Sequence, residues 1–271
     1  MSNIAHLRRF WNWYRGAETV YQVHSPFVYR LGQAVLEDRR QFYAFDDIEA
    51  LRWRLMRSKD TFEMTDYGAG SRVTGTTTRR LAQVAKDSAN AGRRGRLLFR
   101  LVNFLKPQSI LELGTSLGIG SLYQQAGAAK AEFITLEGCP QTAARARHHF
   151  GVMKRPGIEV RTGPFKDTLP RVLTEKGSFD YIFIDGDHRY EPTLRYFEQL
   201  LPHTTERSVL VFDDIHWSEG MERAWREIRH HERVALSIDF FFCGVVFFRS
   251  EQREQEHFDL APTRWKPWMM R

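Results

Sequence analysis

From Ser109 onward the chain alternates between short apolar runs and amphipathic stretches, and this alternation limits the fold more than any other feature. Strand-length runs separated by helical stretches are typical of βαβ units with a parallel sheet. The runs are Ser109–Leu113, Glu132–Glu137, Gly157–Arg161, Asp180–Asp185, Ser208–Asp213, Val234–Phe240 and Gly244–Phe248. Too few residues join the last two runs for a parallel crossover, so the last strand is predicted to be antiparallel. The sequence therefore predicts an α/β fold with a mostly parallel sheet of seven strands.

The segment before this alternation, residues 1–95, has no strand-like pattern of any length. Ser25-Pro26 is typical of a helix start, and Asp47–Arg57 carries apolar residues at helical spacing. Thr65–Gly75 is a Gly-rich break, after which Thr77–Ala85 again has a helical pattern. We therefore expect a helical N-terminal cap or arm (1–95), an α/β domain (96–250) and a C-terminal tail (251–271).

The composition indicates the cellular compartment and the classes of binding partner to expect. The only cysteines are Cys139 and Cys243, so we expect no disulfide framework, and a reducing cytoplasm is the default. The longest apolar run, Phe240–Phe248, has nine residues and is too short to cross a bilayer, so no membrane partner is expected. Residues 1–108 hold 19 basic and 10 acidic residues, a balance that suits nucleic acid, phosphorylated substrates, acidic lipid or simply a solvated helical surface.

Three turns in the α/β part have the residues of a nucleotide-type cofactor site. The first predicted strand ends in Glu112-Leu113-Gly114-Thr115-Ser116-Leu117-Gly118, where glycines permit a sharp turn and close ligand approach before a helix start. Glu137 ends the second strand 25 positions after Glu112, where a carboxylate can accept hydrogen bonds from ribose hydroxyls. The third strand leads into Thr162-Gly163-Pro164-Phe165, a turn able to lie against an adenine ring.

This series resembles the class I S-adenosylmethionine-dependent methyltransferases over roughly residues 96–250, which implies a Rossmann-like fold. By that resemblance Glu112 and Gly114 line the amino-acid end of the cofactor, Glu137 holds the ribose, and Gly163–Phe165 flank the adenine. The alternative for Glu137 is a solvated carboxylate at a strand end. The implied cofactor-binding residues are Glu112, Leu113, Gly114, Thr115, Ser116, Gly118, Glu137, Gly138, Gly163, Pro164, Phe165 and Asp185. Asp66–Ser71 has similar residues, but no apolar strand frames it, and we interpret it as a decoy or a lid.

Carboxylates follow the fourth and fifth predicted strands. Asp185-Gly186-Asp187-His188 ends one, and Asp213-Asp214-Ile215-His216 ends the next. Neighbouring parallel strands end side by side, so Asp185, Asp213 and Asp214 are expected to converge. Clustered carboxylates repel one another unless a cation neutralises them, and oxygen ligands suit Mg²⁺. The sequence therefore predicts a divalent metal site at these three residues.

These two stretches resemble those of divalent-metal O-methyltransferases of the catechol and caffeoyl-CoA type. Those families have an Asp-Asn pair after the fifth strand. This chain has Asp214 in place of the Asn, so the resemblance does not indicate which metal ion would bind. The Asp-Gly-Asp-His turn is more similar to sugar O-methyltransferases of macrolide biosynthesis. That resemblance implies metal binding by Asp185, Asp213 and Asp214 and catalysis by His188 as general base, for which an ordinary imidazole pKa is suited. The alternative for His188 is a helix cap or a hydrogen bond to Asp213, and His216 is interpreted as a packing or pocket-wall residue.

The predicted function is therefore transfer of a methyl group from S-adenosylmethionine to a hydroxyl of a small molecule or sugar. A homodimer is compatible with this prediction. A nucleic-acid methyltransferase is the first alternative, although the fourth strand lacks an Asn/Asp-Pro-Pro-aromatic turn, and Cys139-Pro140 has the reverse order of a Pro-Cys nucleophile. A non-enzymatic binding protein and a NAD(P)-linked oxidoreductase are the others. The chain also resembles methyltransferases found widely in Bacteroidetes bacteria, and that resemblance supplies no substrate.

Overall fold

The computed structural model describes residues 3–65, 76–87, 92–250 and 254–269. The chain divides into two compact units. The first unit comprises Met1–Asp38 and Ser178–Arg271, and the second unit comprises Arg39–Gly177.

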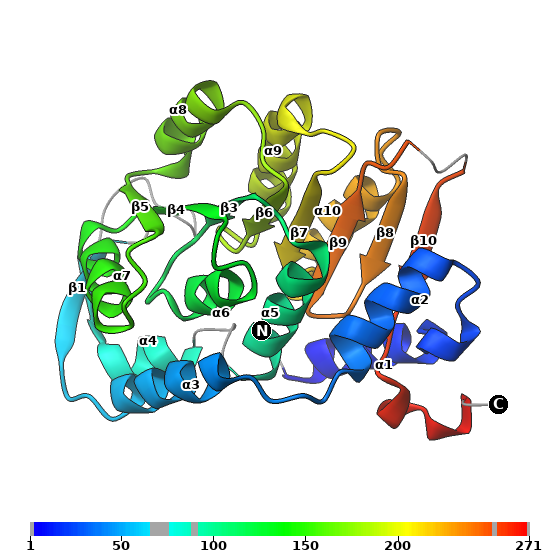
Figure 1. Ribbon diagram of the computed structural model, residues 1–271, viewed down its shortest axis with the longest axis horizontal. Coiled ribbons are helices and arrows are strands. Elements are labelled where there is room, and N and C mark those ends of the chain that lie inside the picture. Colours follow the sequence, from blue (N-terminus) through cyan, green and yellow to red (C-terminus); the bar gives the residue numbers. More distant parts are fainter. Residues whose placement is uncertain (1–2, 66–75, 88–91, 251–253, 270–271) are drawn as a thin grey trace. The chain divides into compact units, whose positions relative to one another are not determined.

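The second unit contains three parallel strands in the order β3-β4-β5 (Figure 1). Leu113 pairs with Leu136 and Glu137 with Thr162, so the carboxyl ends of the three strands lie at one edge. A helix follows each strand, as the alternation predicts. These elements are β3 (Ser109–Leu113), α6 (Ile119–Gly127), β4 (Glu132–Glu137), α7 (Pro140–Val152), β5 (Ile158–Thr162) and α8 (Phe165–Lys176). Before them come α3 (Tyr43–Met56), α4 (Leu81–Asp87) and α5 (Arg93–Leu105).

Two short strands in this unit lie where the sequence predicts only helix. β1 (Thr61–Thr65) and β2 (Thr76–Arg80) form an antiparallel pair, and α4 begins only at Leu81. β-branched threonines are restricted at χ1 and favour extended backbone, which explains strands without an alternating apolar pattern. The predicted helical pattern of Thr77–Ala85 is therefore correct only from Leu81 onward. The Asp66–Ser71 stretch lies outside the described residues.

The first unit contains five strands in the order β10-β8-β9-β7-β6. β6 and β7 are parallel, and β9 runs antiparallel to both β7 and β8, which confirms the predicted direction of the last apolar strand. The elements are α1 (Asn3–Gly16), α2 (Pro26–Gly32), a π-helical turn (Gln33–Glu37), β6 (Tyr181–Ile184), α9 (Tyr190–Leu200), β7 (Val209–Asp213), α10 (Glu219–Arg229), β8 (Leu236–Asp239), β9 (Cys243–Phe247) and β10 (Glu256–Asp259). Short 3₁₀ turns occupy Val20–Gln22, Leu201–His203, Thr263–Trp265 and Pro267–Met269.

The predicted mostly parallel α/β fold is confirmed, but the two units contribute eight such strands rather than seven. The additional strand, β10, lies in the segment 251–271 that the sequence predicts as a tail. Its residues Glu-His-Phe-Asp contain no apolar run, and its strand character comes from parallel pairing with the buried β8. Such tertiary pairing overrides local pattern.

The first unit also joins segments far apart in the sequence. Trp13 and Ala17 at the end of α1 are buried with Phe241 and Ala261. The Lys266 ammonium, itself buried, donates to the Ala17 carbonyl, and the Tyr14 hydroxyl donates to the Trp265 carbonyl. These contacts attach α1 firmly to the C-terminal segment.

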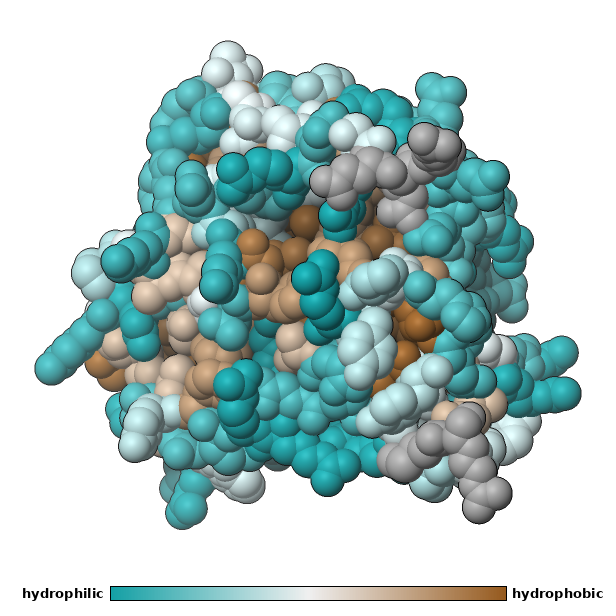
Figure 2. Space-filling model, turned by 45° about the vertical axis from the view of Figure 1, so that its right-hand side comes forward, coloured by the Kyte–Doolittle hydropathy of each residue, from teal (hydrophilic) through white to brown (hydrophobic). Residues whose placement is uncertain are grey.

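In the described part of the chain, no helix combines the length and the apolar character needed to span a bilayer. Hydrophobic residues nevertheless reach the surface, where they lie among hydrophilic ones (Figure 2).

Gly244 in β9 provides a test of packing in the first unit. A Cβ there would lie 2.5 Å from the Trp225 ring, whereas a Cβ at Gly151 would have no neighbour within 4 Å. We expect Gly244→Ala to lower the free energy of unfolding by about 1–3 kcal/mol through overpacking. Gly151→Ala, the matched control, should be neutral or slightly stabilising because alanine is favoured in a helix. Urea denaturation measures both, and equal stabilities would contradict this packing.

Candidate functional site

The loop after β3 is tightly wound. Gly114 and Gly118 have φ angles of 106° and 80°, and Ser116 has a φ of 49°. The Gly114 amide donates to the Leu136 carbonyl at 2.9 Å, which holds the loop against the end of β4. A Cβ at Gly118 would lie 2.5 Å from the Phe150 ring, so only glycine allows α7 to approach the start of α6 this closely. The predicted role of these glycines in shaping a sharp turn is therefore confirmed.

Glu137 is the point at which the predicted cofactor turns meet. Its carboxylate accepts hydrogen bonds from the Ser116 amide at 2.8 Å and the Cys139 amide at 2.9 Å, and the residue is only 9% exposed. Its carbonyl accepts from the Gly163 amide at 2.9 Å. Glu137 is thus not the solvated carboxylate of the alternative interpretation. The structure brings Ser116, Glu137 and Gly163 together, and Gly138 follows in the same turn.

The adenine-side turn lies at the start of α8. Gly163 has a φ of 144°, Pro164 caps the helix, and Phe165 is its first residue. All three are half-buried. This turn therefore leaves part of its surface accessible beside Glu137.

Glu112 has a different environment from Glu137. It is 1% exposed, and its carboxylate accepts hydrogen bonds from Gln124 Nε2 and Thr135 Oγ1, both at 2.7 Å, and from Ser121 Oγ. These donors lie on α6 and β4. The carboxylate therefore links β3 to α6 and β4. Its contact with the cofactor stays a prediction. Thr115 joins the same group through a 2.6 Å contact with the Thr135 hydroxyl.

Two residues of α7 that the sequence analysis did not select also hold the loop. His149 Nδ1 lies 2.9 Å from the Leu117 carbonyl, and burial lowers the His149 pKa. Phe150 packs on Gly118. No spacing or motif in the sequence points to them, because their role depends on the approach of α7 to the loop.

In the first unit, β6 and β7 carry the predicted acidic residues. Asp185 follows β6, and Asp213 ends β7 and is 2% exposed. Asp214 has a φ of 53°, and its amide donates to the Phe242 carbonyl at 2.7 Å. The short turn between β8 and β9 therefore fixes the backbone at Asp214.

His188 lies within this acidic group. Its Nε2 is 3.3 Å from Asp185 Oδ1. The sequence analysis gives a hydrogen bond to Asp213 as an alternative role for His188, whereas this contact is with Asp185. Burial lowers the His188 pKa, but the hydrogen bond and charge of Asp185, with the charges of Asp214 and Asp213, outweigh it and raise the pKa to about 9. The His188 pKa thus differs from the ordinary imidazole value expected from the sequence, and the carboxylates around it favour the protonated form.

The predicted metal ligands are not arranged as a ready cation site. Across residues 3–65, 76–87, 92–250 and 254–269, no group of three or more His, Cys, Asp or Glu side chains is placed to hold a metal ion. Asp185, Asp213 and Asp214 supply suitable oxygen atoms but do not fit a metal ion as they lie.

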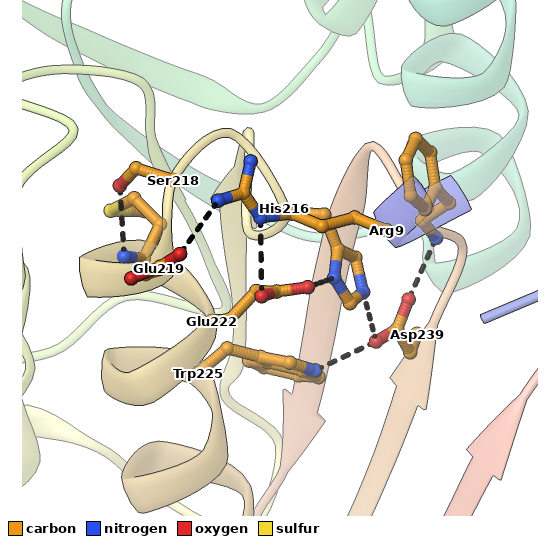
Figure 3. Close-up of polar contacts among 9 residues, drawn as sticks. Arg9, His216, Ser218, Glu219, Glu222, Trp225 and Asp239 are labelled. Carbon is orange, nitrogen blue, oxygen red and sulfur yellow. Dashed lines mark hydrogen bonds and ion pairs between the residues drawn. The ribbon is translucent and has the colours of Figure 1, made fainter. Parts of the chain in front are cut away.

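His216 is a structural residue, as the sequence analysis expects. Its Nδ1 and Nε2 atoms each lie 2.9 Å from a carboxylate oxygen, of Glu222 and Asp239 respectively (Figure 3). Its ring stacks on Phe241, with centroids 5.0 Å apart. Asp239 also accepts from Trp225 Nε1 at 2.9 Å, and Arg9 of α1 donates to Glu222 at 3.3 Å. With both ring nitrogens engaged, His216 links β8 and α10 and, through Glu222, α1.

Comparisons with known proteins agree with this site. Residues 111–215 match a protein family described as a methyltransferase domain. A catechol O-methyltransferase of Niastella koreensis is 33% identical over 127 residues, which cover 45% of this chain and 55% of that protein. A catechol O-methyltransferase of Mycobacterium tuberculosis is 31% identical over 144 residues, covering 49% of this chain and 63% of that protein. The chain thus spans between about half and two thirds of the length of these curated relatives.

A solved structure adds evidence for the fold. The O-methyltransferase from Bacillus cereus in complex with SAH matches with a TM-score of 0.52 and 22% identity, over 77% of this chain and 92% of that one. At this identity the likeness shows the fold alone. Together with the matched domain and the curated relatives, it confirms the resemblance seen in the sequence. Residues 111–215 are thus similar to a methyltransferase domain, and the fold is that of a solved O-methyltransferase.

Proposed function

We propose that this chain transfers the methyl group of S-adenosylmethionine to a hydroxyl oxygen of a small-molecule acceptor. The observation that carries the proposal is the meeting of the Gly-rich loop and the Gly163 turn at Glu137. These turns lie within the segment that matches a methyltransferase domain. The names of the curated relatives, both catechol O-methyltransferases, support a hydroxyl acceptor.

We propose that the second unit binds the cofactor. The Glu137 carboxylate would accept hydrogen bonds from the ribose hydroxyls, which a nearly buried carboxylate does strongly because it is charged. Ser116 and its neighbours would present backbone amides next to the ribose, and Gly163–Phe165 would pack on the adenine. When bound, S-adenosylmethionine supplies an electrophilic methyl group on a sulfonium.

We propose His188 as the proton acceptor. Methylation of a hydroxyl oxygen would release the hydroxyl proton, which needs an acceptor. His188 would take this proton at Nε2 or Nδ1, and Asp185 would stabilise the resulting imidazolium. Because a base must be neutral before it accepts, and the raised pKa favours protonated His188, that proton has to leave first.

The cofactor proposal is tested by calorimetry with S-adenosylhomocysteine. We expect Glu137→Ala to weaken binding by about 1.5–3 kcal/mol, the size of one hydrogen bond to a charged group. Glu132→Ala, at the opposite end of β4 and paired with Lys176, is the matched control and should bind as the wild type does. Thermal melts show whether each variant is folded. Failure of the folded wild type to bind S-adenosylhomocysteine would refute the proposal.

The catalytic proposal is tested with catechol as probe acceptor. His188→Ala should lose a factor of about 10²–10⁴ in rate, typical for removal of a positioned base, while binding S-adenosylhomocysteine normally. Free imidazole should restore part of the rate if His188 acts on a proton. His203→Ala, at a 3₁₀ turn after α9, serves as the control substitution. A fully active His188→Ala enzyme would show that another group accepts the proton.

A divalent cation at Asp185, Asp213 and Asp214 is a separate part of the proposal, and it needs its own test because these residues form no ready site. If it binds there, Mg²⁺ or Mn²⁺ should raise the Tm by ligand linkage, and Asp213→Asn should reduce the rise. Asp180→Asn, at the opposite end of β6 from Asp185, should leave the rise unchanged. A wild-type Tm that does not respond to either ion contradicts the cation site.

A further inference from the structure

Helix α1 carries large apolar side chains on two neighbouring sides. Phe10, Trp13 and Tyr14 pack inside the first unit, against residues that include Phe241 and Trp265. On the other side Ile4, Leu7 and Trp11 are 78%, 65% and 56% exposed. The apolar sector of α1 therefore extends past its packed side onto exposed positions, and this exposed part has the character of a contact surface.

The exposed residues form one continuous face. At 100° per residue, Ile4, Leu7, Arg8, Trp11 and Arg15 lie within an arc of about 100° along the helix. All five are exposed, and we call them the outer face of α1. The apolar side chains therefore share one side of the helix with two arginines.

The charge of this face has one sign. Asn3–Gly16 contains no acidic residue, so Arg8 and Arg15 give the outer face a purely positive charge. The remaining arginine of α1, Arg9, lies on another side, where it contacts Glu222 and Glu219 (Figure 3). An apolar face with a tryptophan and arginines fits the boundary between lipid headgroups and acyl chains.

We propose that the outer face of α1 binds the surface of an anionic lipid bilayer. Ile4, Leu7 and Trp11 enter the interface, and Arg8 and Arg15 contact the negatively charged headgroups. This is attachment to one leaflet and does not require a helix that spans the bilayer. It is independent of the proposed methyl transfer.

Charge favours lipid over the other partners of such a face. In a two-fold contact between copies, the outer face would meet itself and bring Arg8 and Arg15 toward their counterparts with no acid on the helix to pair them. A nucleic acid would satisfy the arginines, but its phosphate backbone gives Ile4 and Leu7 no apolar environment. An anionic bilayer satisfies both kinds of side chain.

The first unit presents this face in a preformed state. Trp13 and Ala17 are buried, and Arg9 is joined to α10 through Glu222, which itself contacts His216 (Figure 3). The helix is therefore ordered before it meets a partner, and binding does not have to offset the entropy of folding it.

Vesicle flotation of the full chain tests the proposal. The protein should float with phosphatidylcholine vesicles that contain phosphatidylserine, bind pure phosphatidylcholine far less, and dissociate as salt rises. Arg8→Gln with Arg15→Gln should lower the partition coefficient roughly 30-fold, about fivefold for each arginine. Leu7→Ser with Trp11→Ser should abolish flotation and the blue shift of tryptophan emission. Trp53→Ser, an exposed tryptophan on α3, is the control and should bind as the wild type does.

Several results would overturn the proposal. Wild-type protein that stays with the solvent at low salt, or outer-face variants that float as well as the wild type, would show that the face does not bind lipid. A dimer in sedimentation velocity that Trp11→Ser dissociates would assign the face to a second copy. Binding of an RNA oligonucleotide that the arginine variant loses, without flotation of the wild type, would assign it to nucleic acid. Thermal melts establish that every variant is folded.

Discussion

The hydrogen bonds of the Glu137 side chain and backbone are the constraint on which the candidate cofactor site depends. The carboxylate joins the loop after β3 to the turn before α7, and the carbonyl of the same residue holds the turn before α8. Three segments that are separate in sequence therefore take their positions from one residue at the end of one strand. Glu112, deeper in the unit, fixes the strand and helix on which that loop rests.

Much of this arrangement follows from local sequence, and the rest depends on contacts between distant segments. The predicted bounds Ser109–Leu113 and Glu132–Glu137 are those of β3 and β4, because buried strands give strong apolar runs. The sequence pattern does not predict β10, because its four residues contain no apolar run. It is a strand because it pairs with β8, a separate segment of the chain. The link from Arg9 to Glu222 joins residues 213 positions apart, and no motif signals it. The hydrogen bonds of individual side chains were not predictable from the sequence.

The acidic group in the first unit illustrates this limit. The parallel register of β6 and β7 puts Asp185 and Asp213 at neighbouring strand ends, and the sequence argument assigns a cation to offset the repulsion among these residues and Asp214. In the structure His188 lies 3.3 Å from Asp185, and the neighbouring carboxylates raise its pKa. A proton on a histidine and a metal ion are alternative means of neutralising carboxylates, and residue types alone do not distinguish them.

The central claim is that Glu137 organises and contacts the cofactor, and a crystal structure with S-adenosylhomocysteine bound tests it most directly. The account predicts both ribose hydroxyls at hydrogen-bonding distance from the Glu137 carboxylate, about 2.7–3.2 Å, with the adenine against Gly163–Phe165. S-adenosylhomocysteine bound elsewhere on the chain, or with its ribose held by residues other than Glu137, would contradict it.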